Sequence, residues 1–267
     1  MTKKTNMVEI IRREKLFYDI ADAKLICKDG NELKVNKAIL AFHIKEFQEI
    51  FYDSKGKPRE ISVITINEAG AELFKLFLDC VLGFKEMQVE DVLQIYGLVL
   101  KYDLSDLKAE CAKVLTPKGM TDNTPKVLKL SLSYDDHIDL RNACLRAMVA
   151  YGLKNIFNQE KYYDIIDPKC ALLLLEEDKS FDKDVVLGLL KWGAYWMRRT
   201  DPNLTIREYF EKNGVFDKLT AIYHEYDDPT DFIEFYKTGP LKNMYTEEEI
   251  FAYSGKMWKN LRKKKQV

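Results

Sequence analysis

The spacing of apolar residues changes once along this chain, at about residue 66. Before that point two short runs alternate apolar and charged residues, and the dipeptide Asp29-Gly30 lies between them. A period of two is typical of strands with one buried face, and Asp-Gly readily adopts the positive φ angles of a tight hairpin turn. The pattern predicts two antiparallel strands over residues 23–35. A third strand is expected over residues 60–66, where β-branched residues dominate.

Beyond the third run, apolar residues recur at steps of three and four, which is the spacing of helices with one buried face. This spacing is found over residues 73–82, 92–99 and 107–115, and over most of the chain beyond residue 120. Prolines and glycines divide the later region into short helices. We therefore expect an α+β domain over the first 115 residues and an all-α domain after them, with a junction near residues 116–121.

The composition agrees with two domains of a water-soluble protein. Of 267 residues, 46% are hydrophobic and 32% are charged, which is enough apolar material to build a core. The longest uninterrupted apolar run, residues 171–175, is far shorter than the roughly 20 residues of a membrane-spanning helix. The first residues contain no apolar signal core. We expect an intracellular protein, cytoplasmic or nuclear, that does not associate with a membrane.

The charge balance argues against a direct nucleic-acid partner. The formal net charge is -1, so a general nucleic-acid-binding surface has no electrostatic basis. The exception is the C-terminus, where six basic residues lie between Lys256 and Lys265. A solvated tail is the simpler interpretation of this cluster, and a nuclear import signal or a weak anionic contact is the alternative.

The sequence contains no recognisable catalytic, metal-binding or cofactor-binding pattern. The histidines His43, His137 and His224 lie far apart, no glycine-rich phosphate loop is present, and the acidic stretch 224–228 lacks the spacing of a calcium loop. Five widely spaced cysteines form no Cys-x-x-Cys pair, which indicates buried thiols in a reducing compartment. We predict that the protein is not an enzyme and holds neither cofactor nor metal.

The order of elements in the first half resembles the BTB/POZ family. Members open their first strand with an Asp-hydrophobic pair, as Asp22-Ala23 does here, and follow the hairpin with an apolar helix. The chain departs from the family where Asn36 replaces the usual histidine and Val81-Leu-Gly83 replaces Tyr-Thr-Gly. The resemblance is carried by Ala21-Asp22-Ala23, Asn36-Lys-Ala-Ile-Leu-Ala41, Phe47, Phe51, the segment 78–93, Tyr102, Leu104, Leu107 and Cys111. It implies a small mixed sheet capped by helices over residues 21–116, after a dimerisation helix segment at residues 1–20.

The second half resembles a BACK domain, which in relatives follows the BTB/POZ domain directly and supplies stacked helical hairpins. The likeness is carried by Asp122-Asn123, Leu128, Leu130, Tyr134, Leu140, Cys144, Leu189-Leu-Lys-Trp192 and the segment 231–249. It implies a helical domain over residues 121–253, followed by a basic tail at residues 254–267. No kelch, zinc-finger or MATH-like module is recognisable.

The resemblance implies a homodimer formed through the first domain. Met7, Val8 and Ile11 on one side of the leading helix would pack on the second subunit, because burying an apolar stripe drives association. Asp22 and Lys37 match the family's paired charges near that interface, so a partly buried ion pair between them is expected.

Three further expectations concern partners. The resemblance implies a cullin contact at Phe51, Pro58 and Glu60, which would make the chain a substrate adaptor of a cullin-RING ubiquitin ligase. The alternative is a non-degradative scaffold or a transcription-associated oligomer. In the helical half, Trp192, Tyr195 and Trp196 either pack in the core, as their helical spacing favours, or line a groove that binds a partner protein.

Overall fold

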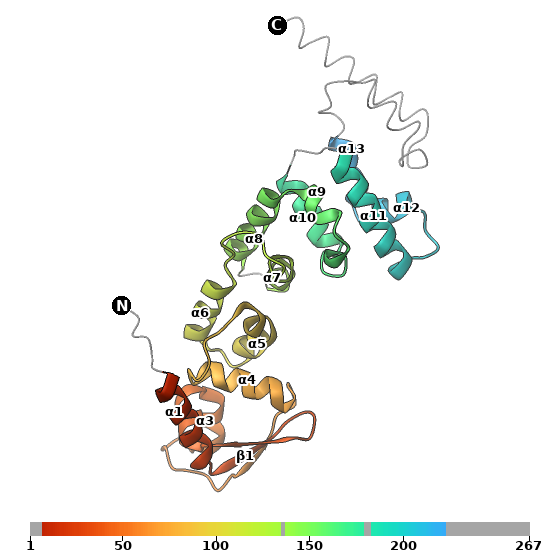
Figure 1. The fold of residues 1–267 in the computed structure, drawn as a ribbon. Coiled ribbons are helices and arrows are strands. Elements are labelled where there is room, and N and C mark those ends of the chain that lie inside the picture. Colours follow the sequence, from red (N-terminus) through yellow and green to blue (C-terminus); the bar gives the residue numbers. More distant parts are fainter. Residues whose placement is uncertain (1–6, 135–136, 179–182, 223–267) are drawn as a thin grey trace, which may run out of the picture. The chain divides into compact units, whose positions relative to one another are not determined.

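The computed structural model describes residues 7–134, 137–178 and 183–222 (Figure 1). The chain divides into two compact units, residues 1–116 and residues 117–267. The side chains of Met7, Val8 and Ile11 lie outside the described part, although the backbone of the first helix begins at Met7. None of the helices in the described ranges is both long enough and apolar enough to cross a membrane.

The first unit contains a three-stranded sheet in the order β2-β1-β3, formed by β1 (Ala23–Ile26), β2 (Glu32–Val35) and β3 (Val63–Thr65). Strands β1 and β2 are antiparallel, β1 and β3 are parallel, and Leu25 lies opposite both Leu33 and Ile64. Gly30 adopts a φ of 79° in the hairpin turn, as the Asp-Gly pair predicts. The predicted mixed sheet is confirmed.

The third strand is shorter than the sequence predicts. Only Val63–Thr65 form the strand, whereas residues 60–66 were expected from their β-branched character. The reason is that β3 pairs with β1, and β1 is itself only four residues long. Ile61 is half-buried just before the strand and does not join it.

Helices cover the sheet and complete the first unit: α1 (Met7–Asp19), α2 (Lys37–His43), α3 (Lys45–Phe51), α4 (Ala71–Val81), α5 (Val89–Lys101) and α6 (Ser105–Leu115). Five buried aromatic rings from α3, α4 and the end of α5 contact one another, and they are Phe47, Phe51, Phe74, Phe77 and Tyr102. This aromatic cluster fixes these helices against one another.

Polar side chains from neighbouring segments cap two of these helices. Asn36, where the BTB/POZ family usually has a histidine, accepts a hydrogen bond from the backbone N–H of Ile39 at 3.1 Å and donates one to the carbonyl of Ile20 at 3.0 Å. The first contact caps α2 and the second joins it to the end of α1. Asp29 in the hairpin turn accepts from the backbone N–H of Ala71 at 3.0 Å, and so caps α4 from a distance of 42 residues along the chain.

The second unit is helical throughout its described part, which confirms the predicted change of class. Its helices are α7 (Thr124–Ser131), α8 (Ile138–Tyr151), α9 (Leu153–Phe157), α10 (Pro168–Glu177), α11 (Lys183–Thr200), α12 (Ile206–Lys212) and α13 (Val215–Ile222), with a short 3-10 turn at Glu160–Tyr162. Helices adjacent in sequence pack on each other, as α7 does on α8 and α11 on α12, and α11 also packs on α9.

Two glycines allow the close packing around α11. A Cβ atom on Gly188 would lie 2.8 Å from the Cβ of Phe157 and 2.9 Å from its backbone carbonyl carbon. A Cβ atom on Gly193 would overlap the ring of Phe210. Both phenylalanines are fully buried, so α9 and α12 can approach α11 only because these positions carry no side chain.

Candidate interaction surface

Helix α1 has a buried face and an exposed face. Phe17 is buried and its ring lies 5.9 Å from that of Phe84 in an edge-on contact. Leu16 on α1 and Ile20, in the turn directly after the helix, remain 57% and 44% exposed. Because the helix is already held on the first unit by Phe17, these two side chains form an apolar stripe that points away from the core.

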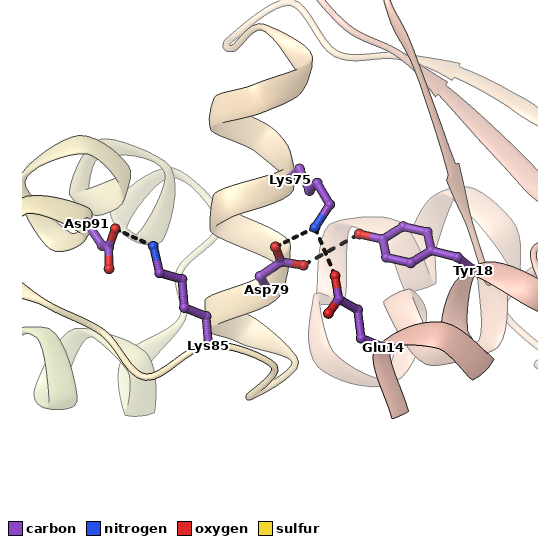
Figure 2. Close-up of polar contacts among 6 residues, drawn as sticks. All are labelled: Glu14, Tyr18, Lys75, Asp79, Lys85 and Asp91. Atoms are coloured by element: carbon purple, nitrogen blue, oxygen red, sulfur yellow. Dashed lines mark hydrogen bonds and ion pairs between the residues drawn. The ribbon is translucent and has the colours of Figure 1, made fainter. Parts of the chain in front are cut away.

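A cluster of polar side chains, Glu14, Tyr18, Lys75 and Asp79, joins α1 to α4 (Figure 2). The ammonium group of Lys75 lies 2.7 Å from the carboxylate of Asp79 and 3.1 Å from that of Glu14. The hydroxyl of Tyr18 donates to Asp79 at 3.5 Å, and the ring of Tyr18 lies 5.4 Å from the same ammonium group. One cation thus contacts two carboxylates and an aromatic ring, which fixes the orientation of α1.

Burial and neighbouring charges shift the pKa values of the groups in this α1–α4 cluster. Burial raises the pKa of the Asp79 carboxyl group and of the Tyr18 hydroxyl, and in Tyr18 the nearby Asp79 charge raises it further. Burial alone would lower the pKa of Lys75, but its hydrogen bonds to Asp79 and Glu14 raise it overall. Lys75 therefore keeps its positive charge throughout the neutral range.

Replacing Lys75 by methionine should loosen α1 from the first unit. Two carboxylates would then face each other without a cation, so we expect the free energy of unfolding to fall by about 1 kcal/mol. Amide hydrogen exchange over Met7–Asp19 should accelerate at the same time. Lys45→Met is the matched control, because Lys45 is far more exposed and only lies 3.8 Å from Glu49. Unchanged exchange in α1 would contradict the role given to Lys75.

A second ion pair fixes the connection between α4 and α5. The ammonium of Lys85 lies 2.6 Å from the carboxylate of Asp91, whose other oxygen accepts from the backbone N–H of Gln88 at 3.2 Å (Figure 2). Asp91 is buried, and the contacts with Lys85 and Gln88 compensate for the loss of water around its charge. This pair is structural and lies beside the α1–α4 cluster.

The surface between α2 and α3 is hollowed. The hollow has a volume of about 650 Å³ and is lined by Ala38, Ala41, Phe42, Gln48, Glu49, Tyr52, Asp53, Ser54, Gly56 and Arg59. At its rim Phe42 is 85% exposed, although phenylalanines in the described part of this unit are otherwise mostly buried. A ring that stays in water beside a concave surface is typical of a protein contact site.

The part of the chain that contains α1 and the hollow matches a known family. Residues 12–118 match the BTB/POZ domain, which covers the sheet, all six helices but the first turn of α1, and the hollow. This part of the chain is a BTB/POZ domain. A search of curated proteins found no match. A BTB/POZ domain is a protein–protein interaction and oligomerisation domain, so the exposed stripe on α1 and the hollow beside Phe42 both lie on a domain whose role is to bind proteins.

The charged pair expected in the BTB/POZ domain makes a different contact. The carboxylate of Asp22 accepts a hydrogen bond from the backbone N–H of Lys37 at 2.8 Å, and no ion pair joins the two side chains. The ammonium group of Lys37 lies 6.0 Å from the centre of the Phe51 ring instead. Asp22 therefore helps to hold the first turn of α2. The backbone N–H groups at a helix start have no partner within the helix, so the N–H of Lys37 is available to the carboxylate of Asp22.

Of the three residues assigned to a cullin contact, one is in the core. Phe51 is 0% exposed and stacks on Phe47 with ring centres 6.0 Å apart, so its ring offers no surface to a partner. Pro58 and Glu60 are exposed on the segment that follows α3. The expectation for Phe51 is corrected for a physical reason: its helical spacing from Phe47 places both rings on the inner face of α3.

Of the three aromatic residues of α11 that were expected to line a groove, one is buried and two are partly exposed. Trp192 is fully buried and its indole N–H donates to the carbonyl of Ile166 at 2.7 Å, so it belongs to the core and lines no groove. Trp196 is half-buried and donates to the carbonyl of Tyr163 at 2.8 Å. Tyr195 is partly exposed, and its hydroxyl bonds to Asp164 and Arg199. Of these three side chains, Tyr195 and Trp196 keep part of their surface exposed.

The predicted burial of the five cysteines is confirmed. Burial raises the pKa of the Cys80 thiol to about 11 and those of Cys111 and Cys144 to about 12. At neutral pH these thiols stay protonated, and a protonated thiol is a poor nucleophile and a poor metal ligand. Over residues 7–134, 137–178 and 183–222, His, Cys, Asp and Glu form no group of three or more that could hold a metal ion.

Proposed function

We propose that this chain is a non-catalytic interaction adaptor, which homodimerises through its BTB/POZ domain and holds a partner protein through its helical second unit. The observation that carries the proposal is the exposed apolar stripe of Leu16 and Ile20 at the end of α1, a helix whose other face is already fixed. Burying such a stripe against a copy of itself removes apolar surface from water, which favours association.

The geometry of α1 makes it a suitable surface for self-association. Phe17 and the α1–α4 cluster hold the helix in a defined position before any partner arrives. A rigid surface loses little conformational entropy on binding, so more of the burial free energy appears as affinity. Met7, Val8 and Ile11, the interface residues expected from the sequence, have side chains outside the described part, so the proposal rests on Leu16 and Ile20.

Replacing both Leu16 and Ile20 by aspartate should convert a dimer into a monomer. Two pairs of like charges would face each other across a two-fold axis, and two apolar contacts would be lost. Light scattering after size-exclusion chromatography measures the mass directly. Ile138→Asp, at an exposed apolar position of α8, is the matched control and should leave the mass unchanged. A dimer that survives the double substitution would exclude α1 from the interface.

We also propose that the second unit is BACK-like and is the part that binds the partner. Its helices pack as sequence neighbours, α7 on α8, α11 on α12 and α12 on α13, which supports a stack of helical hairpins. Tyr195 and Trp196 keep part of their rings exposed on α11. Aromatic side chains of this kind commonly contribute most of the affinity of an interface.

A role as a substrate adaptor of a cullin-RING ubiquitin ligase is the more specific form of this proposal. Exposed Pro58 and Glu60 support it, since they follow α3 where the resemblance places the cullin contact. Buried Phe51 favours the alternative, a non-degradative scaffold, because it leaves that contact without its aromatic member. Affinity purification of the full chain from cells separates the two: a cullin that co-purifies and is lost in Glu60→Ala supports the adaptor, and its absence supports the scaffold.

The proposal of a non-catalytic role rests on the ionisable groups themselves. The thiols of Cys111, Cys144 and Cys170, whose pKa values are raised by burial, lie in the core, and the shifted groups of the α1–α4 cluster bind one another. These shifts therefore have a structural explanation, whereas an active site would gather shifted groups around an open cleft.

A further inference from the structure

We propose that Phe42 and the hollow between α2 and α3 are the two halves of a self-complementary contact, in which Phe42 of each copy enters the hollow of the other. The proposal rests on the dimerisation proposed above and extends it from α1 to a second, named part of the interface. Four observations support it: the exposure of Phe42, the small side chains in the hollow, the rigid turn that forms one wall, and the charges on the rim.

Phe42 has the properties of an interface residue. It lies in the last turn of α2, is 85% exposed, and its ring contacts that of His43 at 5.1 Å in an edge-on arrangement. Leaving a phenylalanine in water forgoes about 1.5–3 kcal/mol of burial free energy. A second molecule that covers this ring would recover part of that free energy.

The hollow beside Phe42 has room for an aromatic ring. Ala38 and Ala41 line it from α2, and Tyr52 lines it from the end of α3. Ala38 lies one helical turn before Phe42, so a short side chain and an exposed ring adjoin on the same face of α2. A two-fold axis places the same patch of both copies face to face, so a protruding ring beside a recess can fit its own duplicate.

The opposite wall of the hollow is a hydrogen-bonded turn. The carboxylate of Asp53 accepts from the backbone N–H groups of Lys55 and Lys57, both at 2.8 Å, and Gly56 adopts a φ of 73°. The backbone N–H of Arg59 then donates to the carbonyl of Phe51 at 2.7 Å, which closes the segment onto α3. The recess therefore exists before binding, and filling it requires little ordering of the chain.

The rim of the hollow carries both signs of charge. Glu49 contributes a carboxylate, which lies 3.8 Å from Lys45 with both side chains largely exposed. Arg59 contributes a guanidinium group whose side chain makes no ion pair within the described residues. In a two-fold arrangement, Arg59 of one copy can face Glu49 of the other, and this pairing occurs twice.

The position of α2 favours a second copy as the occupant over an unrelated protein. Asn36, which caps α2, donates to the carbonyl of Ile20 and so fixes α2 beside the end of the exposed stripe on α1. The segments that carry Leu16, Ile20 and Phe42 are thus tied to each other by this hydrogen bond. A single symmetric interface can cover both helices, whereas an unrelated ligand of the hollow would leave the stripe on α1 in water.

The first test is Phe42→Ala in the full chain. We expect the dimer dissociation constant to rise by about 30-fold, which is typical of a buried aromatic hot spot, with no change in the denaturation midpoint of the monomer. Val63→Ala, at an exposed apolar position of β3 outside the hollow, should leave the dissociation constant unchanged. Sedimentation velocity across a dilution series measures both constants.

The second test uses charge reversal at the rim. Glu49→Arg and Arg59→Glu should each weaken the homodimer by at least about tenfold, because each variant faces a like charge twice. A mixture of the two variants should recover the dimer, since both contacts are again of opposite sign in the heterodimer. An ion pair within one molecule could not be restored by mixing.

The outcomes separate this proposal from the proposal of dimerisation through α1. A dimer that is broken by aspartate at Leu16 and Ile20 but unaffected by Phe42→Ala, with no recovery on mixing, would overturn the role of the hollow and leave dimerisation through α1 intact. A wild-type chain that stays monomeric would remove both. Weakening by Phe42→Ala together with recovery on mixing is the result that the proposal requires.

Discussion

Replacing Phe74 by alanine should lower the free energy of unfolding of the BTB/POZ domain by about 3–5 kcal/mol. Phe74 is fully buried on α4, and its ring lies within 5.4–6.4 Å of the ring centres of Phe47, Phe77 and Tyr102. Truncation removes contacts with all three and leaves a cavity where α3, α4 and the end of α5 meet. A loss of this size is a large fraction of the total stability of a domain, which is about 5–15 kcal/mol.

Urea denaturation followed by far-ultraviolet circular dichroism measures this loss, and amide exchange over Ala71–Val81 assigns it to the first unit. Val63→Ala is the control, because it shortens an apolar side chain at an exposed position of the same unit, outside the proposed dimer contacts. We expect that control to change the stability by less than about 1 kcal/mol. Equal losses in the two variants would contradict the assignment of Phe74 to the core.

Replacing Gly188 by alanine should destabilise the second unit by about 1–3 kcal/mol, which is opposite in sign to the usual effect of this substitution in a helix. The added methyl group would lie 2.8 Å from the Cβ of Phe157 and 2.9 Å from its carbonyl carbon. The second of these atoms belongs to the backbone of α9, so a rotation of a side chain cannot relieve the overlap. Helices α9 and α11 would have to separate.

Tryptophan fluorescence reports on this change, because Trp192 lies in the core beside Phe157 with ring centres 5.9 Å apart. Gly119→Ala is the control, since a Cβ atom at Gly119 in the same unit would meet no other atom within 4 Å. There we expect no loss, and a gain of up to about 1 kcal/mol because alanine restricts the unfolded chain. A stabilising effect of Gly188→Ala would show that α9 and α11 do not approach as closely as described.

The parts of the fold that depend on local chemistry were predictable from the sequence. The hairpin at Asp29-Gly30 forms as expected, although Gly30 takes a positive φ and Asp29 does not, because glycine adopts this conformation at little cost wherever it lies. The helical spacing after residue 66 likewise predicted that helices follow the sheet and that the second domain is all-α. The length of the third strand was not predictable, because it depends on how many residues of β1 remain available for pairing.

The candidate interface could be predicted only in outline. Phe42, Phe47 and Phe51 look alike in the sequence, yet Phe42 is exposed and the other two are buried. The difference arises at Ile44, which adopts an extended conformation with a φ of -129° and separates α2 from α3. The helical phase therefore restarts after Ile44, and a spacing rule that runs across this break assigns the wrong residues to the core.

Contacts between distant segments account for the remaining differences. The bond from Lys37 to Asp22 uses a backbone donor, which a reading of side-chain charges does not reveal. Trp192 and Trp196 share a helix face, but the depth of each is set by the packing of α9 and α12 on α11. The α1–α4 cluster joins residues 61 positions apart, as in the contact of Glu14 with Lys75, and no local pattern indicates such a partner.

The mass of the wild-type chain in solution tests the central claim most directly. Sedimentation equilibrium over a wide range of concentrations should show a reversible monomer–dimer equilibrium, with a limiting mass twice that of the 31.2 kDa chain. The aspartate variant of Leu16 and Ile20 should keep the mass of a single chain under the same conditions. A wild-type chain that sediments as a monomer at every concentration would contradict the account.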